Sequence, residues 1–263
     1  MLILLPPSEG KAPDGAAGRR RRPLDLARLS FPELTEARAR VLDGLTRLCA
    51  DPAAAAGALR LGPTQRDEIA RNTVLRTAPA LPAAEIYTGV LYEALDVATL
   101  APDARRFVDR TVVIFSGLWG AVRLADRIPP YRCSVGVNLP DLGGLASWWR
   151  RHLSGALTVA ARGRLVMDLR SGGYAPMWSP TGQVAAVRVL HERLVDGLAT
   201  RTVVSHFNKA TKGRLVRDLA TRAATVETAG ELVTALRDLK YTVDAAASAD
   251  GLRHRLDVVV SDL

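Results

Sequence analysis

The first eleven residues of the chain, MLILLPPSEGK (Met1–Lys11), indicate the fold and the place of a site. Met1 to Leu5 are apolar without a polar break, which is typical of a strand buried on both faces of a sheet. Pro6 and Pro7 have no amide hydrogen to give to a ladder, so the strand is predicted to end there. A hydroxyl, a carboxylate, a glycine and an ammonium group follow, in Ser8 to Lys11. Whether they form a site depends on how the other strands end.

The same pattern recurs three more times. The apolar runs Thr111–Phe115 (TVVIF), Arg164–Leu169 (RLVMDL) and Thr202–Phe207 (TVVSHF) each predict a strand, and each precedes a loop of small, polar and charged residues. If these strands are neighbours in one mixed sheet, their loops converge on one rim, where open α/β sheets bind ligands. YTVDAA and RLDVVV predict two late strands.

Helical patterns occupy most of the remaining chain. They cover Phe31 to about Cys49, the stretches 53–58 and 66–76, the residues after a turn at Thr88 and Gly89, and the run LVRDLATRAA. No repeat and no sharp change of composition divides the chain. The sequence therefore predicts an α/β (α+β mixed) protein in which helices surround a mixed sheet, as a single domain over residues 1–263.

The chain is strongly basic, with 36 Lys and Arg against 27 Asp and Glu and a net charge of +9. This charge favours anionic partners such as nucleic acid or phosphorylated metabolites, although an arginine-rich proteome explains it equally well. Cys49 and Cys133 belong to no CxxC pair, so we expect reduced thiols. No apolar run approaches the ~20 residues of a membrane helix, and the start lacks signal-peptide features. We expect a cytoplasmic protein with no membrane partner.

The segment NKATKGR (Asn208–Arg214) predicts an anion site. Asn208 or Thr211 is expected to cap the helix that follows. Three cations would then surround free backbone N–H groups, which suits phosphate; a solvated basic turn is the alternative. These cations are Lys209, Lys212 and Arg214.

Two other loops carry candidate ligand contacts. In SGLWGAVRLADRIPPYR (residues 116–132), Arg123 and Arg127 are four apart, which predicts one helical face; with the aromatic residues they suit stacking on bases and pairing with phosphates. Shielding or core packing is the alternative for the tryptophans. In LRSGGY, two glycines let a backbone approach a ligand closely, between Arg170 and Tyr174.

Several common sites have no support in the sequence. The G-x-x-x-x-G-K-[ST] spacing and the G-x-S-x-G elbow are both missing. The four histidines show no metal-binding spacing, so we expect neither a metal site nor a cofactor. They are His152, His191, His206 and His254.

Six landmarks in order resemble the peroxide stress protein YaaA family, also called DUF328 or UPF0246. The landmarks are MLILLPPSEGK, YTG, SGLWGAVRLADRIPPYR, SWW, VMDLRSGGY and SHFNKATKGR, spread from Met1 to about Leu219. Better-studied members have SPAKT in place of PPSEGK; Lys11 matches the lysine of both versions, and Glu9 has no counterpart in SPAKT. The resemblance implies a cytoplasmic α/β protein of unusual fold with a positively charged cleft and a helix-hairpin-helix-like element. It also implies DNA binding, a role in oxidative stress and a limiting effect on free iron.

Two functions remain open. The first is a stress protein that binds the DNA phosphate backbone through a basic cleft and helps to limit free iron and oxidative DNA damage. Its expected phosphate contacts are Ser8, Lys11, Ser116, Arg123, Arg127, Arg132, Arg170, Lys209, Lys212 and Arg214. The second is an enzyme acting on a nucleotide or another phosphorylated small molecule at a strand-end pocket. Its pocket would contain Ser8, Glu9, Lys11, Tyr174, Lys209 and Lys212, with Glu9, Lys11, Tyr174 and Lys209 as catalytic groups.

A structure discriminates between the two functions: a deep pocket lined by these residues favours the enzyme, and a broad open groove favours DNA. We expect Lys11 to reach the same anion as Lys209 and Lys212, and a lysine left in solvent is the alternative. The field of nearby arginines would make the Cys133 thiol sensitive to peroxide. A buried, inert thiol is the alternative there.

Overall fold

The computed structural model describes residues 1–12, 22–195, 198–202 and 205–261. Its centre is an eight-stranded sheet in the order β12-β13-β10-β9-β1-β4-β5, with β11 paired to β10. The strands are β1 (Leu2–Leu5), β4 (Val112–Ser116), β5 (Gly120–Val122), β9 (Val166–Asp168), β10 (Val184–Val195), β11 (Leu198–Thr202), β12 (Thr242–Ala247) and β13 (Arg253–Ser261).

The middle of this sheet is parallel. Strands β13, β10, β9, β1 and β4 run in one direction, while β5, β11 and β12 each pair antiparallel to a neighbour. The register sets Ile3 of β1 opposite Val112 of β4, and Leu2 opposite Val166 of β9. The carboxyl ends of these three strands therefore lie at one edge, as the sequence predicts. The prediction of a mixed α/β fold is confirmed.

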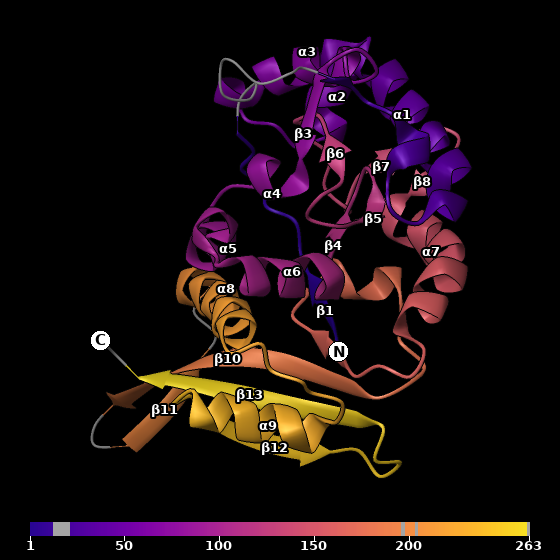
Figure 1. Ribbon diagram of the computed structural model, residues 1–263. Helices are drawn as coiled ribbons and strands as arrows, with labels where there is room; N and C mark the ends of the chain where they lie inside the picture. The colour runs from indigo at the N-terminus through magenta and orange to yellow at the C-terminus, as the bar shows by residue number, and fades with distance from the viewer. Residues whose placement is uncertain (13–21, 196–197, 203–204, 262–263) are drawn as a thin grey trace.

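Nine α-helices lie in the described residues. They are α1 (Thr35–Cys49), α2 (Pro52–Ala58), α3 (Asp67–Thr73), α4 (Ala83–Ile86), α5 (Val90–Leu95), α6 (Pro102–Thr111), α7 (Leu145–Ala161), α8 (Ser205–Thr221) and α9 (Ala229–Asp238). Of these, α7, α8 and α9 pack directly on strands of the eight-stranded sheet. Figure 1 shows α8 between α5 and β10, and α9 against the layer of β12 and β13. Helices α1 and α7 lie along the right of the molecule in this view.

Short elements join these helices and strands. The 3-10 helices are η1 (Leu26–Arg28), η2 (Pro32–Leu34), η3 (Pro63–Gln65), η4 (Val97–Thr99) and η5 (Ala175–Met177). Two small sheets are built from β2 (Arg22–Pro23), β3 (Pro79–Pro82) and β6 (Arg127–Ile128), and from β7 (Asn138–Leu139) and β8 (Gly143–Gly144).

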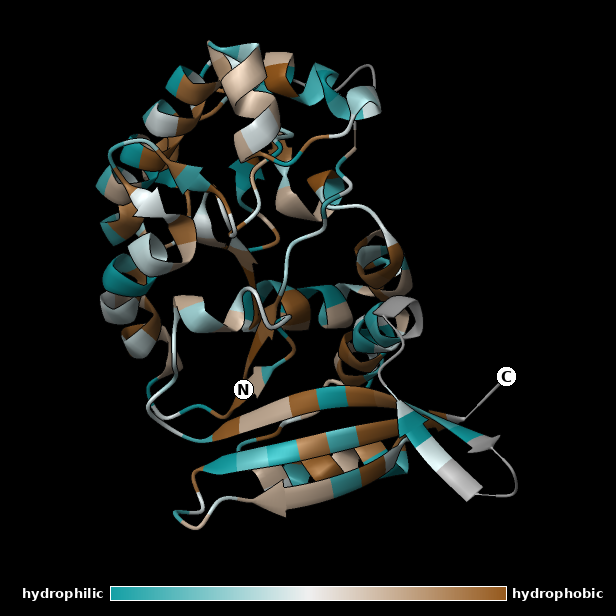
Figure 2. Ribbon diagram, turned by 180° about the vertical axis from the view of Figure 1, so that it is seen from behind, coloured by the Kyte–Doolittle hydropathy of each residue, from teal (hydrophilic) through white to brown (hydrophobic). Residues whose placement is uncertain are grey.

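The central strands are buried on both faces. Every residue of β1 has zero exposure, which explains why its sequence is apolar without alternation. The same concentration of apolar residues appears as brown ribbon through the middle of Figure 2. Trp119 and Trp149 are fully buried and Trp148 nearly so, which confirms the core alternative for the tryptophans.

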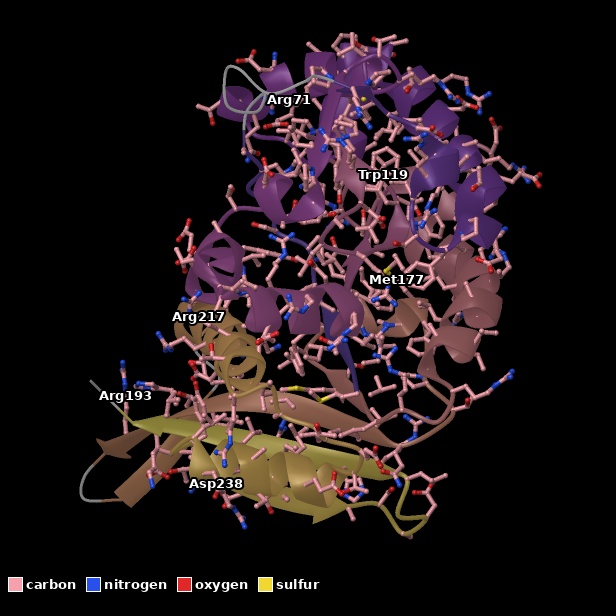
Figure 3. The ribbon with its side chains drawn as sticks, viewed as in Figure 1. Arg71, Trp119, Met177, Arg193, Arg217 and Asp238 are labelled. Carbon is pink, nitrogen blue, oxygen red and sulfur yellow. The ribbon has the colours of Figure 1, made fainter. Side chains whose placement is uncertain are left out.

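Helix α8 is held tightly to α5. A Cβ built on Gly213 would lie 2.1 Å from the carbonyl oxygen of Leu91, so the two backbones touch at a position that only glycine fits. One turn further on, Arg217 donates to the carbonyls of Leu95 and Asp96, at 3.0 and 2.8 Å, where α5 ends. Figure 3 shows Arg217 projecting from α8 towards this end of α5. These contacts fix the position of the basic segment of α8.

Two predictions of secondary structure are wrong. Strand β11 ends at Thr202 and α8 begins at Ser205, so the predicted strand Thr202–Phe207 is largely helix; residues 203–204 lie outside the described residues. The helix begins early because apolar side chains such as Leu215 and Leu219 bury one face of it. Asn208–Arg214 therefore lies inside α8, and neither Asn208 nor Thr211 caps it.

The predicted helical face for Arg123 and Arg127 is also wrong. This part of the chain forms β5, a turn and β6. Gly120 has φ +73° at the reversal into β5, a conformation that interrupts a helix. The spacing of four residues therefore does not place the two arginines on one face of a helix.

Candidate functional site

A cleft of about 620 Å³ opens at the carboxyl ends of β1 and β9, against α5, α8 and β10. We name it the rim cleft. Its lining combines the PPSEGK and RSGGY loops with the basic segment of α8. Of the four strand-end loops predicted to converge, these two do so; SGLWG does not line the cleft, and NKATKGR reaches it from within a helix. The lining residues are Pro6, Pro7, Ser8, Glu9, Gly10, Gly89, Val90, Leu91, Tyr92, Arg170, Ser171, Gly172, Tyr174, Val187, Arg188, Asn208, Lys209 and Lys212.

The long strand β10 contributes one wall of the rim cleft. Strand β9 pairs with β10 over Val184–Ala186, and β11 pairs with it over His191–Val195. Val187 and Arg188 lie between these two stretches and line the cleft. The cleft thus lies where the partner of β10 changes along one edge.

Two arginines of the rim cleft are already paired with carboxylates. Arg170 makes a two-pronged bond to Asp168, with N–O distances of 2.9 and 2.6 Å, and lies over the Phe115 ring. Arg188 pairs with Asp257 through two bonds of 2.7 Å. Sequence reasoning missed both partners; Asp168, two residues before Arg170 at the strand end, was the one visible signal.

Unlike these arginines, the two lysines of α8 that line the cleft have no carboxylate partner among the described residues, so they are available to bind an anion. Lys209 is exposed, lines the cleft, and makes no hydrogen bond or ion pair within the described part of the chain. Lys212 is buried and donates to the carbonyl of Leu169 at 2.9 Å, and its burial lowers its pKa. A charged ammonium has three donors, so Lys212 keeps two for a ligand.

Lys11 lies behind the wall of the rim cleft and is not among its lining residues. Its ammonium donates to the carbonyl of Ser8 at 2.9 Å and stands 4.3 Å from the centre of the Tyr131 ring. Burial lowers the pKa of Lys11 to about 8. The structure thus excludes the solvent alternative for Lys11, but it does not place the ammonium beside Lys209 and Lys212.

Ser116 belongs to a buried chain of hydroxyl groups. Its Oγ lies 2.6 Å from the Tyr131 hydroxyl, which lies 2.9 Å from that of Tyr87. Because the Ser116 oxygen accepts the N–H groups of Leu118 and Trp119, its own hydrogen points to Tyr131, and that of Tyr131 points to Tyr87. Ser116 has zero exposure, so it holds the loop after β4 and reaches no ligand directly.

Two enclosed polar atoms in the cleft walls make no hydrogen bond of normal geometry to the described residues: the hydroxyl of Tyr174 and Oδ1 of Asn208. The Val135 backbone is close enough to Tyr174 to lower its pKa in part. Burial is the main cause of the raised pKa of Tyr174, which keeps the phenol neutral. An unsatisfied buried group costs about 1–3 kcal/mol. Such groups mark a wall that is not optimised for stability alone.

Arg132, another predicted phosphate contact, is not among the lining residues of the rim cleft but lies beside Glu9, which is. Its Nε lies 3.6 Å from the Glu9 carboxylate, and a second nitrogen donates to the Glu9 carbonyl at 3.4 Å. The amide group of Asn72 holds the Arg132 backbone through bonds of 2.8 and 2.9 Å. The next residue, Cys133, is buried, and burial raises its pKa well above the usual value, as the inert alternative requires.

Three predicted phosphate contacts lie elsewhere. Arg123 donates to the carbonyl of Arg110 at 3.0 Å, where α6 ends, near the start of β4 and not at the rim. Arg127 belongs to β6 and pairs with β3 in a separate small sheet. Arg214 donates to Thr211 on its own helix and is absent from the cleft lining. The arginines and lysines of the two basic segments therefore do not form one group.

The described residues contain neither a membrane-spanning helix nor a cluster of metal-ligating side chains. None of the helices combines the length and apolar character needed to cross a membrane. No three His, Cys, Asp or Glu side chains in that part of the chain gather as metal ligands would.

Similar proteins cover the whole length of the chain. The family model described as "Peroxide stress protein YaaA" matches residues 1–247. A UPF0246 protein of Streptomyces coelicolor is 54% identical over 100% of both chains. Another from Corynebacterium efficiens is 43% identical over 99% of this chain and 100% of its own. An uncharacterized protein of Campylobacter jejuni is 29% identical over 54% of each chain.

Proposed function

The chain belongs to the peroxide stress protein YaaA family, also called UPF0246, and from this premise we propose that it serves the peroxide-stress response by binding a phosphorylated small molecule in the rim cleft. The observation that carries the proposal is the pair Lys209 and Lys212. Both line the cleft, and neither has a carboxylate within ion-pair distance in the described residues. A phosphate group accepts ammonium donors from several directions, which suits two lysines on one helix.

The rest of the cleft favours a nucleotide as the class of ligand. Inorganic phosphate needs far less than about 620 Å³. The wall formed by α5, which packs against α8, includes Val90, Leu91 and Tyr92, and Val187 of β10 adds to the apolar surface. Pockets for small organic ligands are mostly apolar with a few fixed polar groups, and a nucleoside would fill this part.

Turnover of the ligand is a further part of this proposal. Of the four predicted catalytic residues, Glu9, Tyr174 and Lys209 line the rim cleft, while Lys11 stands behind its wall. Glu9 is exposed and offers a carboxylate beside the bound molecule. Product formation from a nucleotide, lost in Glu9→Gln while binding persists, would support an enzymatic role.

DNA binding is the second candidate, favoured by the net charge of +9 and by exposed Lys209 at the cleft. In this alternative, the DNA backbone crosses the cleft. The protein then protects DNA and limits free iron in the cytoplasm. The separation of Arg123 and Arg127 from the lysines of α8 argues against one continuous basic groove. We therefore place the small molecule first.

Calorimetric titration with adenosine monophosphate, inorganic phosphate and a 20-base-pair duplex tests both candidates. We expect saturable binding of the nucleotide at one site per chain, at 50 and at 200 mM salt. Duplex binding through several phosphate contacts falls by orders of magnitude over that range. Binding of the duplex without the nucleotide would favour the second candidate, and no binding of any of the three would overturn both.

A further inference from the structure

One wall of the rim cleft depends on a residue outside it. We propose that Lys11 is a positioning residue, which holds Ser8 and Glu9 in the wall of the rim cleft without touching the bound ligand. The proposal takes its ligand from the function proposed above. Its structural part can be measured without any ligand.

The backbone of Lys11 is fixed against the end of α4 and the turn that follows it. Residue 11 forms an isolated antiparallel bridge with Tyr87. On either side, the amide of Ala12 donates to the carbonyl of Ile86 at 2.9 Å, and the amide of Thr88 donates to the carbonyl of Gly10 at 3.2 Å. The side chain of Lys11 thus starts from a fixed point.

The ammonium closes the loop back on itself. It donates to the carbonyl of Ser8 at 2.9 Å and lies 3.5 Å from that of Glu9. A hydrogen bond from a charged donor is about twice as strong as a neutral one. Pro6 and Pro7 supply no amide hydrogens to the loop after β1, so side chains hold its carbonyls. The Tyr92 hydroxyl donates to that of Pro6 at 2.7 Å, Arg132 to that of Glu9, and Lys11 to that of Ser8 between them.

Ser8 is confined from the other side by Gly89. A Cβ built on Gly89 would lie 3.0 Å from the Ser8 hydroxyl oxygen, and Gly89 has φ +95°. No other residue adopts that backbone easily. The Ser8 hydroxyl is therefore held between Gly89 and the carbonyl that Lys11 grips, at a point where it lines the rim cleft.

No carboxylate of the described residues lies within ion-pair distance of the Lys11 ammonium. The charged or titratable groups that face it are Glu9 on its own loop, Arg132 and the neutral Cys133 thiol on the loop after β6, and Glu68 on α3. The Glu9 carboxylate stands beside Arg132 instead. The rings of Tyr131 and Tyr87 cover the ammonium, at 4.3 and 5.8 Å from their centres. The direct polar contacts that the structure gives this ammonium are the carbonyls of Ser8 and Glu9, which fits a cation that serves the geometry of the loop.

Hydrogen exchange and nucleotide binding together test the proposal. In Lys11→Met we expect the amides of Ala12 and Thr88 to exchange at least tenfold faster, and the affinity for adenosine monophosphate to fall about tenfold. Lys209→Ala is the control and should weaken nucleotide binding with exchange unchanged.

The outcomes separate the two proposals. Unchanged exchange in Lys11→Met with weaker nucleotide binding would mean direct contact with the ligand and would overturn the positioning role. Faster exchange with full affinity would overturn it too, because the wall would then not matter to the ligand. If the parent binds neither the nucleotide nor phosphate, the proposed function fails, and the exchange of Ala12 and Thr88 alone decides whether Lys11 holds the wall.

Discussion

The ammonium of Lys212 donates a hydrogen bond to the main-chain carbonyl of Leu169, 2.9 Å away at the end of β9. The ammonium of Lys11 likewise donates to the main-chain carbonyl of Ser8, in the loop after β1. Two strand-end loops are thus each tied by a lysine to a backbone oxygen, and the rim cleft lies between them. Among the described residues, most of the positive charge at the rim therefore holds the backbone or a carboxylate, while Lys209 and the spare donors of Lys212 are available for an anion.

Gly213 should tolerate no side chain. In Gly213→Ala the new Cβ would meet the carbonyl oxygen of Leu91 at 2.1 Å, so α5 and α8 must separate. We expect the free energy of unfolding to fall by about 3 kcal/mol, measured by urea denaturation. Gly155→Ala on α7 is the matched control: nothing lies within 4 Å of its Cβ, and we expect a gain of roughly 0.5–1 kcal/mol. Equal effects at both positions would contradict the packing described here.

The ion pair of Arg170 and Asp168 should matter for stability far more than a surface pair. Arg170 is almost wholly buried, so Arg170→Met leaves the Asp168 carboxylate without its partner. We expect a loss of about 3–5 kcal/mol in urea denaturation. Arg76→Ala breaks a half-exposed pair with Asp43 and should change stability by less than about 1 kcal/mol. A small effect at Arg170 would show that water reaches Asp168.

The stability of the fold should rise with pH above about 8 through Lys11. Its pKa is about 8 in the folded protein and 10.5 in an ordinary setting, so between these values the unfolded chain binds more protons. The free energy of unfolding then increases with pH, by on the order of 3 kcal/mol across the window. In Lys11→Met this contribution disappears. Parallel urea melts of both proteins from pH 7 to 10 measure it, and identical pH slopes would refute the lowered pKa.

The sequence was sufficient for the strands that meet at the rim. Met1 to Leu5 lack any polar alternation, and two prolines end the run, so both the burial and the end of β1 follow from local chemistry. The loops after β1 and β9 then converge because the strands are parallel neighbours. The burial and the end of β1 depend on local sequence alone, whereas the convergence of the loops also requires that the strands share one sheet.

The start of α8 and the direction of Lys11 depend on distant contacts. The β-branched residues at 202–204 favour a strand locally, but the helix that begins at Ser205 is held by α5, more than a hundred residues earlier. Lys11 turns inward because Tyr87 and Tyr131 are there to cover it. Arg123 and Arg127 have helical spacing by coincidence, since β5 and β6 are set by their partner strands.

Cys133 should resist mild peroxide in the folded protein. It is 4% exposed, and burial raises its pKa, so little thiolate is present to react. Mass spectrometry after brief hydrogen peroxide treatment should find it unmodified at pH 7, and oxidised once the chain is unfolded in urea. Oxidation of Cys133 in the native protein would instead support a peroxide-sensitive thiol at this position.

Lys209 should govern affinity for the phosphate without affecting the fold. Its side chain lines the rim cleft and has no partner among the described residues, so Lys209→Ala removes no contact that stabilises α8. A hydrogen bond from an ammonium to phosphate contributes about 1.5–3 kcal/mol, so we expect adenosine monophosphate to bind roughly 10- to 100-fold more weakly. Arg214→Ala is the matched control, because Arg214 is exposed on the same helix and is absent from the cleft lining. Both variants should unfold at the parent's urea midpoint. If Arg214→Ala weakens binding as much as Lys209→Ala does, the phosphate responds to the overall charge of α8 and not to a position in the rim cleft.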